Sequence, residues 1–239
     1  MKYIILITTL MMAAVFLTGS VCLASQVPEE NETAAYTVCR INGEPDEPGE
    51  PGAPDWDTIP TLYIDHIQWK PDYGVWAQGQ LCYDDEYLYV HLMATEQDIR
   101  AEYTEPLSPV NEDSCLEFFF MPEGEDRYFN FEINPNGCLH FGIGHDRYDR
   151  VFLHRDDYAD YFHITTDRTP DGWEVYYVIP LEFLNVFYPD YQFEGALLAN
   201  FYKCGDKTEH KHYLTWNTVR SEKPDYHRPE DFGRLEFAQ

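Results

Sequence analysis

Short runs rich in β-branched and aromatic residues follow one another along most of the chain, separated by turn residues. Turn sequences such as Asp84-Asp85-Glu86, Asn134-Pro135-Asn136-Gly137 and Thr169-Pro170-Asp171-Gly172 favour tight chain reversals. Strands joined in this way predict an all-β, antiparallel sandwich. One short helix is expected at 181–187, directly after Pro180. The predicted strands are 36–41, 61–67, 76–83, 87–95, 115–121, 128–134, 138–143, 161–166, 173–179, 196–204, 213–216 and 233–237.

Alternation within the run at 128–134 assigns its side chains to two faces of a strand. Phe129, Phe131 and Ile133 form an apolar row, which is expected to face the core. The opposite row carries an aromatic ring, two amides and a carboxylate, and such groups suit a ligand rich in hydroxyl groups because each can donate or accept hydrogen bonds. The alternative is a solvated outer face. This polar row consists of Tyr128, Asn130, Glu132 and Asn134.

Glu117 lies in the apolar run Cys115-Leu116-Glu117-Phe118-Phe119-Phe120. A carboxylate among such residues is costly to bury unless another group satisfies it. Lys203 and Lys223 are two of the few cations in the chain, and an ion pair between Glu117 and either of them would be structural. Glu117 is therefore either a ligand-binding group or half of an ion pair. The run at 200–204 is again amphipathic, with Asn200, Tyr202 and Cys204 in one row.

Four segments carry a resemblance to a known family. They are Asp113-Ser114-Cys115-Leu116-Glu117-Phe118-Phe119, Tyr128-Phe129-Asn130-Phe131-Glu132-Ile133-Asn134, Asn200-Phe201-Tyr202-Lys203-Cys204-Gly205-Asp206, and Asp225-Tyr226-His227-Arg228-Pro229 with Phe232-Gly233. In order, spacing and content they resemble carbohydrate-binding module family 9, over a domain expected at 36–239. The resemblance implies a jelly-roll-like β-sandwich, often stabilised by calcium, that binds plant-type polysaccharide or its oligosaccharides without cleaving it. Its expected partners are a carbohydrate ligand and a separate glycoside hydrolase.

The resemblance also implies a set of site residues. Glu117 matches the ligand-binding Glu of the family, and Tyr226 stands where members place the second of two sugar-stacking tryptophans. Tyr226 would then offer an aromatic face to the C–H groups of a pyranose ring, and Glu117 would bind its hydroxyl groups. The alternative for Tyr226 is packing at a sandwich corner. The family's Arg, Gln and Asn are replaced by Glu132, Tyr202 and Lys223, which therefore occupy site positions with altered chemistry.

Other aromatic residues are considered for the first of the two sugar-stacking rings. The position of the first family tryptophan, shortly before the strand at 115–121, carries no aromatic residue. The sugar sandwich is incomplete unless Tyr103 or Trp216 reaches it from elsewhere. Trp216 and Trp76 each lie in an apolar run and are expected in the core.

The acidic composition of the chain excludes one class of ligand. The chain has 239 residues, with 43 Asp and Glu against 16 Lys and Arg, a formal net charge of -27. Such a surface repels phosphates, so nucleic acids are excluded as ligands. An apolar content of 44%, with 16% aromatic residues, indicates a folded domain.

The N-terminus predicts export. Lys2 precedes an apolar run at 4–17 and small residues up to Ala24, a pattern typical of a signal peptide at 1–24. The run is shorter than the ~20 residues that span a bilayer, so no transmembrane span is expected. The protein should be secreted or periplasmic, with lipid anchoring through Cys22 as the alternative. A polar segment at 25–35 follows, and the acidic Pro/Gly segment at 44–55 is expected to be a surface loop.

Candidate metal ligands are of two kinds. The cysteines left after cleavage lack CxxC or Cys/His spacing, so no zinc site is predicted, and their disulfide pairing stays open. The Asp-rich segments at 146–149 and 156–160 suggest calcium, because a divalent cation relieves repulsion among clustered carboxylates. His210 and His212 are expected to be ordinary surface residues. The remaining cysteines are Cys39, Cys82, Cys115, Cys138 and Cys204.

Two other functional classes are weaker alternatives. For a glycoside-active enzyme, the abundance of carboxylates makes any pair uninformative, and no Ser lies in a nucleophile elbow. A haem-binding electron-transfer module would have Met93 and Met121 as its thioether ligands, without a CxxCH motif. The sequence therefore favours non-catalytic carbohydrate binding.

Overall fold

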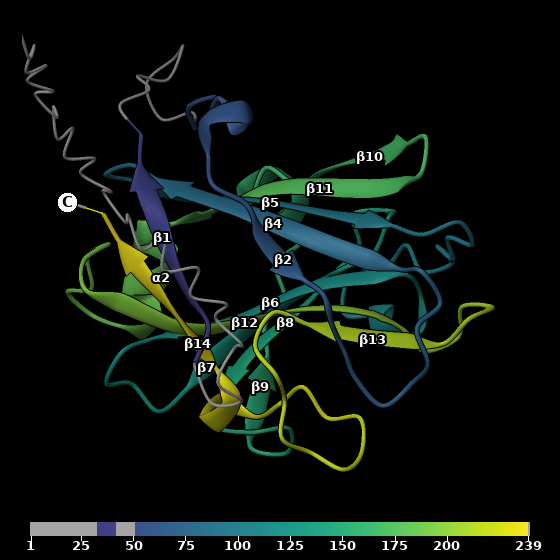
Figure 1. The fold of residues 1–239 in the computed structure, drawn as a ribbon. Coiled ribbons are helices and arrows are strands. Elements are labelled where there is room, and N and C mark those ends of the chain that lie inside the picture. The colour runs from purple at the N-terminus through teal and green to yellow at the C-terminus, as the bar shows by residue number, and fades with distance from the viewer. Residues whose placement is uncertain (1–32, 42–50, 239) are drawn as a thin grey trace, which may run out of the picture. The chain divides into compact units, whose positions relative to one another are not determined.

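A computed structural model describes residues 33–41 and 51–238, in which the strands pair into two sheets joined by β1 (Ala35–Arg40). The first four residues of β1 pair with β14 and its last two pair with β4, in both cases parallel. All other pairings are antiparallel. The predicted all-β, jelly-roll-like sandwich is thus confirmed, with β1 as its only parallel strand among the described residues (Figure 1). The expected signal peptide and most of the acidic loop lie outside the described residues.

One sheet, here called sheet B, runs in the order β10-β11-β5-β4-β1, and β2 pairs with β4. The other, sheet A, runs in the order β1-β14-β12-β6-β7-β8-β9, with β13 placed between β12 and β3. Sheet B contains β2 (Leu62–Ile64), β4 (Trp76–Tyr83), β5 (Tyr87–Thr95), β10 (Thr165–Thr169) and β11 (Gly172–Pro180). Sheet A contains β3 (His66–Ile67), β6 (Cys115–Pro122), β7 (Tyr128–Ile133), β8 (Leu139–Gly144), β9 (Arg150–Phe152), β12 (Ala196–Gly205), β13 (His212–Thr215) and β14 (Gly233–Phe237).

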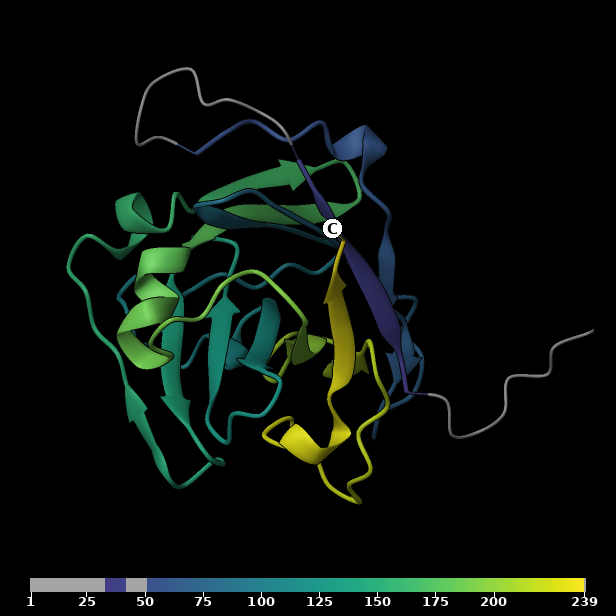
Figure 2. The same cartoon turned by 90° about the vertical axis from the view of Figure 1, so that its left-hand side faces the viewer.

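Helical segments are short. The predicted helix is confirmed as α2 (Leu181–Phe187), which lies beside the sandwich in Figure 2. Its N-cap is Pro180, whose extended backbone ends β11 and leads into the helix. Within the described residues, no helix is long and apolar enough to cross a membrane. The other segments are α1 (Tyr158–Tyr161), η1 (Trp56–Thr58), η2 (Val110–Glu112) and η3 (Pro229–Asp231).

The main core lies between the two sheets. Phe129, Phe131 and Ile133 face it, as their alternation predicts. Across the core, the ring of Phe131 stacks on Tyr177 of β11, with 6.0 Å between ring centroids. Each such buried aromatic side chain stabilises the fold by roughly 1.5–3 kcal/mol relative to exposure. Trp216 belongs to this core, as expected.

The outer face of sheet A is buried as well, so the interpretation of this face as a solvated surface is wrong. Every residue of β6 and β7 is buried. A second cluster, here called the outer cluster, covers this face with side chains from segments outside the two strands. Tyr128 and Phe119 contribute to it from the sheet, whereas Val110, Tyr226 and Phe232 come from connecting segments. Polar side chains on this face are therefore shielded from bulk solvent.

Three local expectations are wrong. The strand expected at 161–166 begins only at Thr165, because the chain makes the turn α1 first and His163 takes a positive φ of 47° before β10 starts. The edge strand β9 is missed because its three residues are too few to show an alternating pattern. Trp76 is 39% exposed, since it starts β4 at the border of the sheet rather than inside the core.

The alternative of an ion pair between Glu117 and Lys203 or Lys223 is also wrong. Lys203 is fully buried, and its Nζ lies 3.0 Å from a carboxylate oxygen of Glu96 and 2.8 Å from Nε2 of His212. Trp173 donates its Nε1 hydrogen to the same carboxylate at 2.7 Å. Burial opposes ionisation of Glu96, but Lys203 and the Trp173 donor outweigh it and lower the pKa of that carboxyl group. Lys203 is thus part of a buried structural network.

We expect this network to make the fold sensitive to acid. Burial, reinforced by the Lys203 ammonium, lowers the pKa of His212 from 6.5 to about 4. Between these two values the unfolded chain binds a proton that the folded chain does not, so stability present at pH 7 is lost as the pH falls. The loss from His212 is about 3 kcal/mol. From about pH 4.5 downward, the lowered pKa of Glu96 removes further stability, because the unfolded chain takes up a proton at this carboxyl group before the folded chain does.

Urea unfolding at a series of pH values measures this effect. His212→Gln should flatten the dependence between pH 6.5 and 4, because the amide can accept from Lys203 without titrating. His154→Gln is the matched control, since His154 is half exposed and pairs only with Asp156 at the surface. An unchanged slope in His212→Gln would show that His212 does not carry the effect.

Candidate functional site

The strand register aligns polar side chains across the outer face of sheet A. Glu117 on β6 stands opposite Glu132 on β7, which stands opposite His140 on β8. The next row joins Asn130 on β7, Gly142 on β8 and Phe152 on β9. Residues that are far apart in sequence thus share one surface because side chains at paired positions point to the same face.

A cavity of about 300 Å³ opens over these rows. Its floor is sheet A from β12 to β9, and its remaining walls come from the segments around Trp69 and 224–227. It is the part of the outer face that the outer cluster leaves uncovered. The lining residues are Trp69, Asn111, Glu117, Asn130, Glu132, His140, Arg147, Arg150, Phe152, Cys204, Asp206, Tyr213, Pro224, Asp225, Tyr226 and His227.

Arg150 supplies unused hydrogen-bond donors. Its Nη1 lies 2.5 Å from Nδ1 of His227, which also contacts the Tyr128 hydroxyl at 2.8 Å. Burial and then the charge of Arg150 lower the pKa of His227 to about 2, so this ring is neutral and can accept. The other guanidinium nitrogens of Arg150, Nε and Nη2, are buried without a hydrogen-bond partner. Such groups are costly unless a ligand or water satisfies them.

Asn130 supplies an unused acceptor. Its amide nitrogen donates to Glu132 at 2.8 Å, whereas its Oδ1 is buried without a partner. Gly142 leaves space beside this oxygen, because a Cβ at that position would lie 3.3 Å from Oδ1 and 2.6 Å from the Val151 carbonyl oxygen. The cavity therefore offers both donors and acceptors on its floor.

Aromatic rings stand at both ends of the cavity. Trp69, which follows β3, has a positive φ of 54°, and its Nε1 donates to the Ser221 carbonyl at 2.7 Å. Its ring packs against Tyr226 with 5.6 Å between centroids. At the other end, Phe152 on β9 is 55% exposed and packs edge-on against His140. The guanidinium carbon of Arg150 lies over the same ring, 5.8 Å from its centroid, so Phe152 is a half-exposed ring with two neighbours in the lining.

Tyr226 differs from the expected exposed platform, which is a correction to the sequence interpretation. It lines the cavity but is only 7% exposed. One face of its ring stacks on Tyr202 at 4.0 Å, and its hydroxyl lies 3.2 Å from the carbonyl oxygens of Lys203 and Leu214. Burial raises the pKa of this hydroxyl well above its usual range. The ring is held as a rigid wall rather than as a free surface.

The remaining predicted residues are distributed unevenly. Glu117 and Glu132 line the cavity with Tyr226, whereas Tyr202 lies beneath Tyr226 and outside the lining. Lys223 is exposed and does not line the cavity. Tyr103 and Trp216, the two aromatic residues considered for the missing ring, do not line it either.

Glu117 is a buried acid on the cavity floor. It is 3% exposed and accepts a hydrogen bond from the Cys204 thiol at 2.9 Å. Burial, followed by the nearby Cys204 and Glu132, raises the pKa of its carboxyl group well above the usual range. These conditions favour the protonated acid, which can donate as well as accept a hydrogen bond.

Trp69, Arg150 and Phe152 were missed from the sequence. Arg150 and Phe152 belong to the short strand β9, and Trp69 follows the two-residue strand β3, so no periodic pattern marked them. In the Asp-rich segment before β9, Asp146 accepts hydrogen bonds from the backbone of Tyr148 and Asp149. That contact gives Asp146 a local role in the turn, and calcium binding stays a prediction.

Comparisons with known proteins agree with this geometry. The model of carbohydrate-binding family 9 matches residues 50–237. The structure is similar to that of a candidate carbohydrate-binding protein from Bacteroides uniformis, with 26% identity and a TM-score of 0.71, over 87% of this chain and 100% of that one. No functionally curated protein matched the chain significantly.

Two further similar structures are of a family 9 carbohydrate-binding module from Caldicellulosiruptor kristjanssonii. The one in complex with glucose has 15% identity and a TM-score of 0.59, over 86% of this chain and 96% of that one. The one in complex with cellotriose has 15% identity and a TM-score of 0.58, over 85% and 93%. At this identity the two structures show a shared fold.

The packing of Tyr226 predicts a large stability effect. Tyr226→Ala should lower the free energy of unfolding by about 3–5 kcal/mol, because it removes a buried ring from the stack on Tyr202. Tyr148→Ala is the control, since Tyr148 is 91% exposed and should change stability by less than about 0.5 kcal/mol. Urea unfolding measures both variants. A stable Tyr226→Ala protein would mean that the ring is not part of the packed wall.

Proposed function

This chain belongs to carbohydrate-binding family 9, and on that premise we propose that its cavity binds a sugar unit of a plant-type polysaccharide or oligosaccharide without cleaving it. A volume of about 300 Å³ is at the lower end of the range for small-ligand pockets and suits one sugar ring. Glucose and cellotriose, the ligands in the two module complexes, are the first candidates.

The observation that carries the proposal is the set of unpaired polar atoms in the cavity. Two nitrogens of Arg150 and one oxygen of Asn130 have no hydrogen-bond partner although they are buried. Sugar hydroxyl groups both donate and accept, so a ligand on the cavity floor is chemically matched to unpaired atoms of both kinds. A hydrogen bond to a charged group contributes about 1.5–3 kcal/mol, which makes Arg150 the strongest expected contact.

Aromatic contacts support the same ligand class. The half-exposed ring of Phe152 lies beside Arg150 on β9, so one strand offers a stacking face and hydrogen-bond donors together. The C–H groups of a pyranose can lie on such a ring while its equatorial hydroxyls reach the guanidinium. Tyr226 and Trp69 close the opposite end as packed walls.

The arrangement of carboxyl groups supports binding without hydrolysis. A glycosidase places two carboxyl groups on either side of the bond that it cleaves. Of the four carboxyl groups in the lining, Glu117 and Glu132 are direct neighbours on adjacent strands of the floor. Asp225 is paired with Arg147, and Asp206 accepts a hydrogen bond from the Tyr213 hydroxyl.

The setting of this function is part of the proposal. A signal peptide at 1–24, or lipid anchoring through Cys22, would place the protein outside the cytoplasm. There it would support glycan degradation together with a separate glycoside hydrolase.

Removing the donors of Arg150 tests the site. Arg150→Met keeps the length of the side chain but cannot hydrogen-bond, and we expect it to weaken binding of glucose and cellotriose about 10- to 100-fold. Arg155→Met is the matched control, since Arg155 is half exposed and pairs with Asp157 outside the cavity. Isothermal titration calorimetry measures both. Equal losses in the two variants would indicate a general charge effect and contradict the proposed site.

A second pair of variants tests the stacking face. Phe152→Ala should weaken sugar binding with little loss of stability, because more than half of the side chain is exposed. Val151→Ala is the control, since Val151 is its neighbour on β9, is 62% exposed and does not line the cavity. Affinity electrophoresis on soluble glucans compares the two variants, and full retention by Phe152→Ala would rule out a stacking role for this ring.

A further inference from the structure

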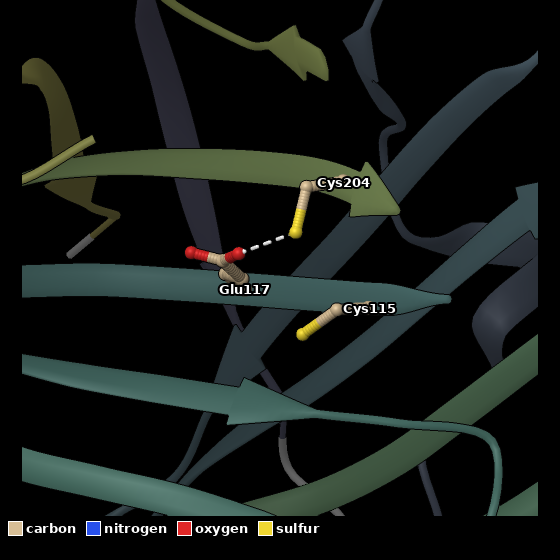
Figure 3. A group of neighbouring side chains, drawn as sticks. All are labelled: Cys115, Glu117 and Cys204. Atoms are coloured by element: carbon tan, nitrogen blue, oxygen red, sulfur yellow. Dashed lines mark hydrogen bonds between the residues drawn. The ribbon is translucent and has the colours of Figure 1, made fainter. Parts of the chain in front are cut away.

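Sheet A brings two thiols and a carboxyl group together in the cavity floor. Cys115 on β6 pairs directly with Cys204 on β12, and Glu117 follows two residues after Cys115 on the same face. Both Sγ atoms and a carboxyl oxygen of Glu117 lie within 4.8 Å of one another (Figure 3). In the part of the chain that the structure describes, no other three His, Cys, Asp or Glu residues bring ligand atoms this close.

These three side chains form a buried cluster, and each of them can lose a proton to become an anion. Cys115, Glu117 and Cys204 are each at most 3% exposed. The nearest basic residue in sequence, Lys203, directs its ammonium group to Glu96 and His212 on the inner side of the sheet. Both thiols are free, so neither is consumed by a disulfide.

We propose that Cys115, Glu117 and Cys204 bind a thiophilic divalent cation of the zinc class. Zinc in proteins is held by thiolates and carboxylates in a four-coordinate arrangement, and three protein ligands leave one position for an exogenous oxygen. Glu117 and Cys204 line the cavity whereas Cys115 lies behind them, so the open position faces the cavity. On binding, the cation replaces the protons of both thiols and of the carboxyl group, which pass to solvent.

The ligand set discriminates among cations. Two thiolates are soft ligands that favour zinc and disfavour calcium and magnesium, which take oxygen ligands only. This site is therefore chemically separate from any calcium site in the Asp-rich loops. Sequence spacing could not reveal it, because register rather than proximity in sequence joins Cys115 to Cys204.

Cobalt substitution tests the proposal directly. The reduced, metal-free protein should bind one equivalent of Co²⁺ with thiolate-to-cobalt charge-transfer absorption, and Zn²⁺ should displace it. Cys115→Ser and Cys204→Ser should lose this absorption and weaken zinc binding by more than about 100-fold, since even supporting groups of a metal site cost 10–100-fold. Cys138→Ser is the matched control, because Cys138 is a buried thiol of the same outer cluster that hydrogen-bonds to the Glu105 carbonyl and is not part of the Cys115, Glu117 and Cys204 group.

Glu117→Gln provides a second test that keeps both thiols and an acceptor for Cys204, and it should also weaken zinc binding. Each variant is first checked for native circular dichroism. The proposal is overturned if the reduced parent takes up no zinc, if Cys138→Ser loses as much as Cys204→Ser, or if Cys115 and Cys204 are recovered as a disulfide from protein isolated without reductant. Calorimetry with glucose on the metal-free parent separates this outcome from failure of the sugar site.

Discussion

The structure depends on one constraint, which is that sheet A is covered on both of its faces. Its inner face packs on sheet B, and the outer cluster shields most of the other. A polar side chain on the outer face must therefore find a partner within the protein or in a bound molecule. Tyr202 stacks beneath Tyr226, whereas parts of Asn130 and Arg150 remain unpaired. The unpaired atoms lie where the cover is open, and that opening is the cavity.

Two kinds of ionisable group are buried on the two faces of sheet A. Lys203 and Glu96 satisfy each other inside the sandwich, and they serve the fold. Glu117, on the opposite face of the same sheet, has a thiol and a second carboxyl group as neighbours, and burial with these neighbours raises the pKa of its carboxyl group and favours the neutral acid. Because side chains alternate between the two faces of a strand, Lys203 on β12 points into the sandwich and forms a stabilising ion pair there. Glu117 on β6 points to the outer face and lines the cavity.

The sequence was most informative where the strands are long. Alternation in 128–134 identified both the core row and the polar row, and the boundaries of β4, β5, β14 and α2 followed from turn residues and Pro180. The sequence was uninformative where tertiary contacts determine the position of a side chain. Nothing local indicates that Tyr226 packs on Tyr202, that Arg150 reaches the cavity from an edge strand, or that Lys203 pairs with Glu96 rather than Glu117.

The central claim, that a sugar binds over the outer face of sheet A, is tested most directly by mapping the contact surface. Titration of isotope-labelled protein with cellotriose, followed by amide chemical shifts, locates the ligand without any substitution. The account predicts that the largest shifts occur at Asn130, Gly142 and Phe152, with little change along β10 and β11 of sheet B. Shifts centred on sheet B, or none at saturating sugar, would contradict it.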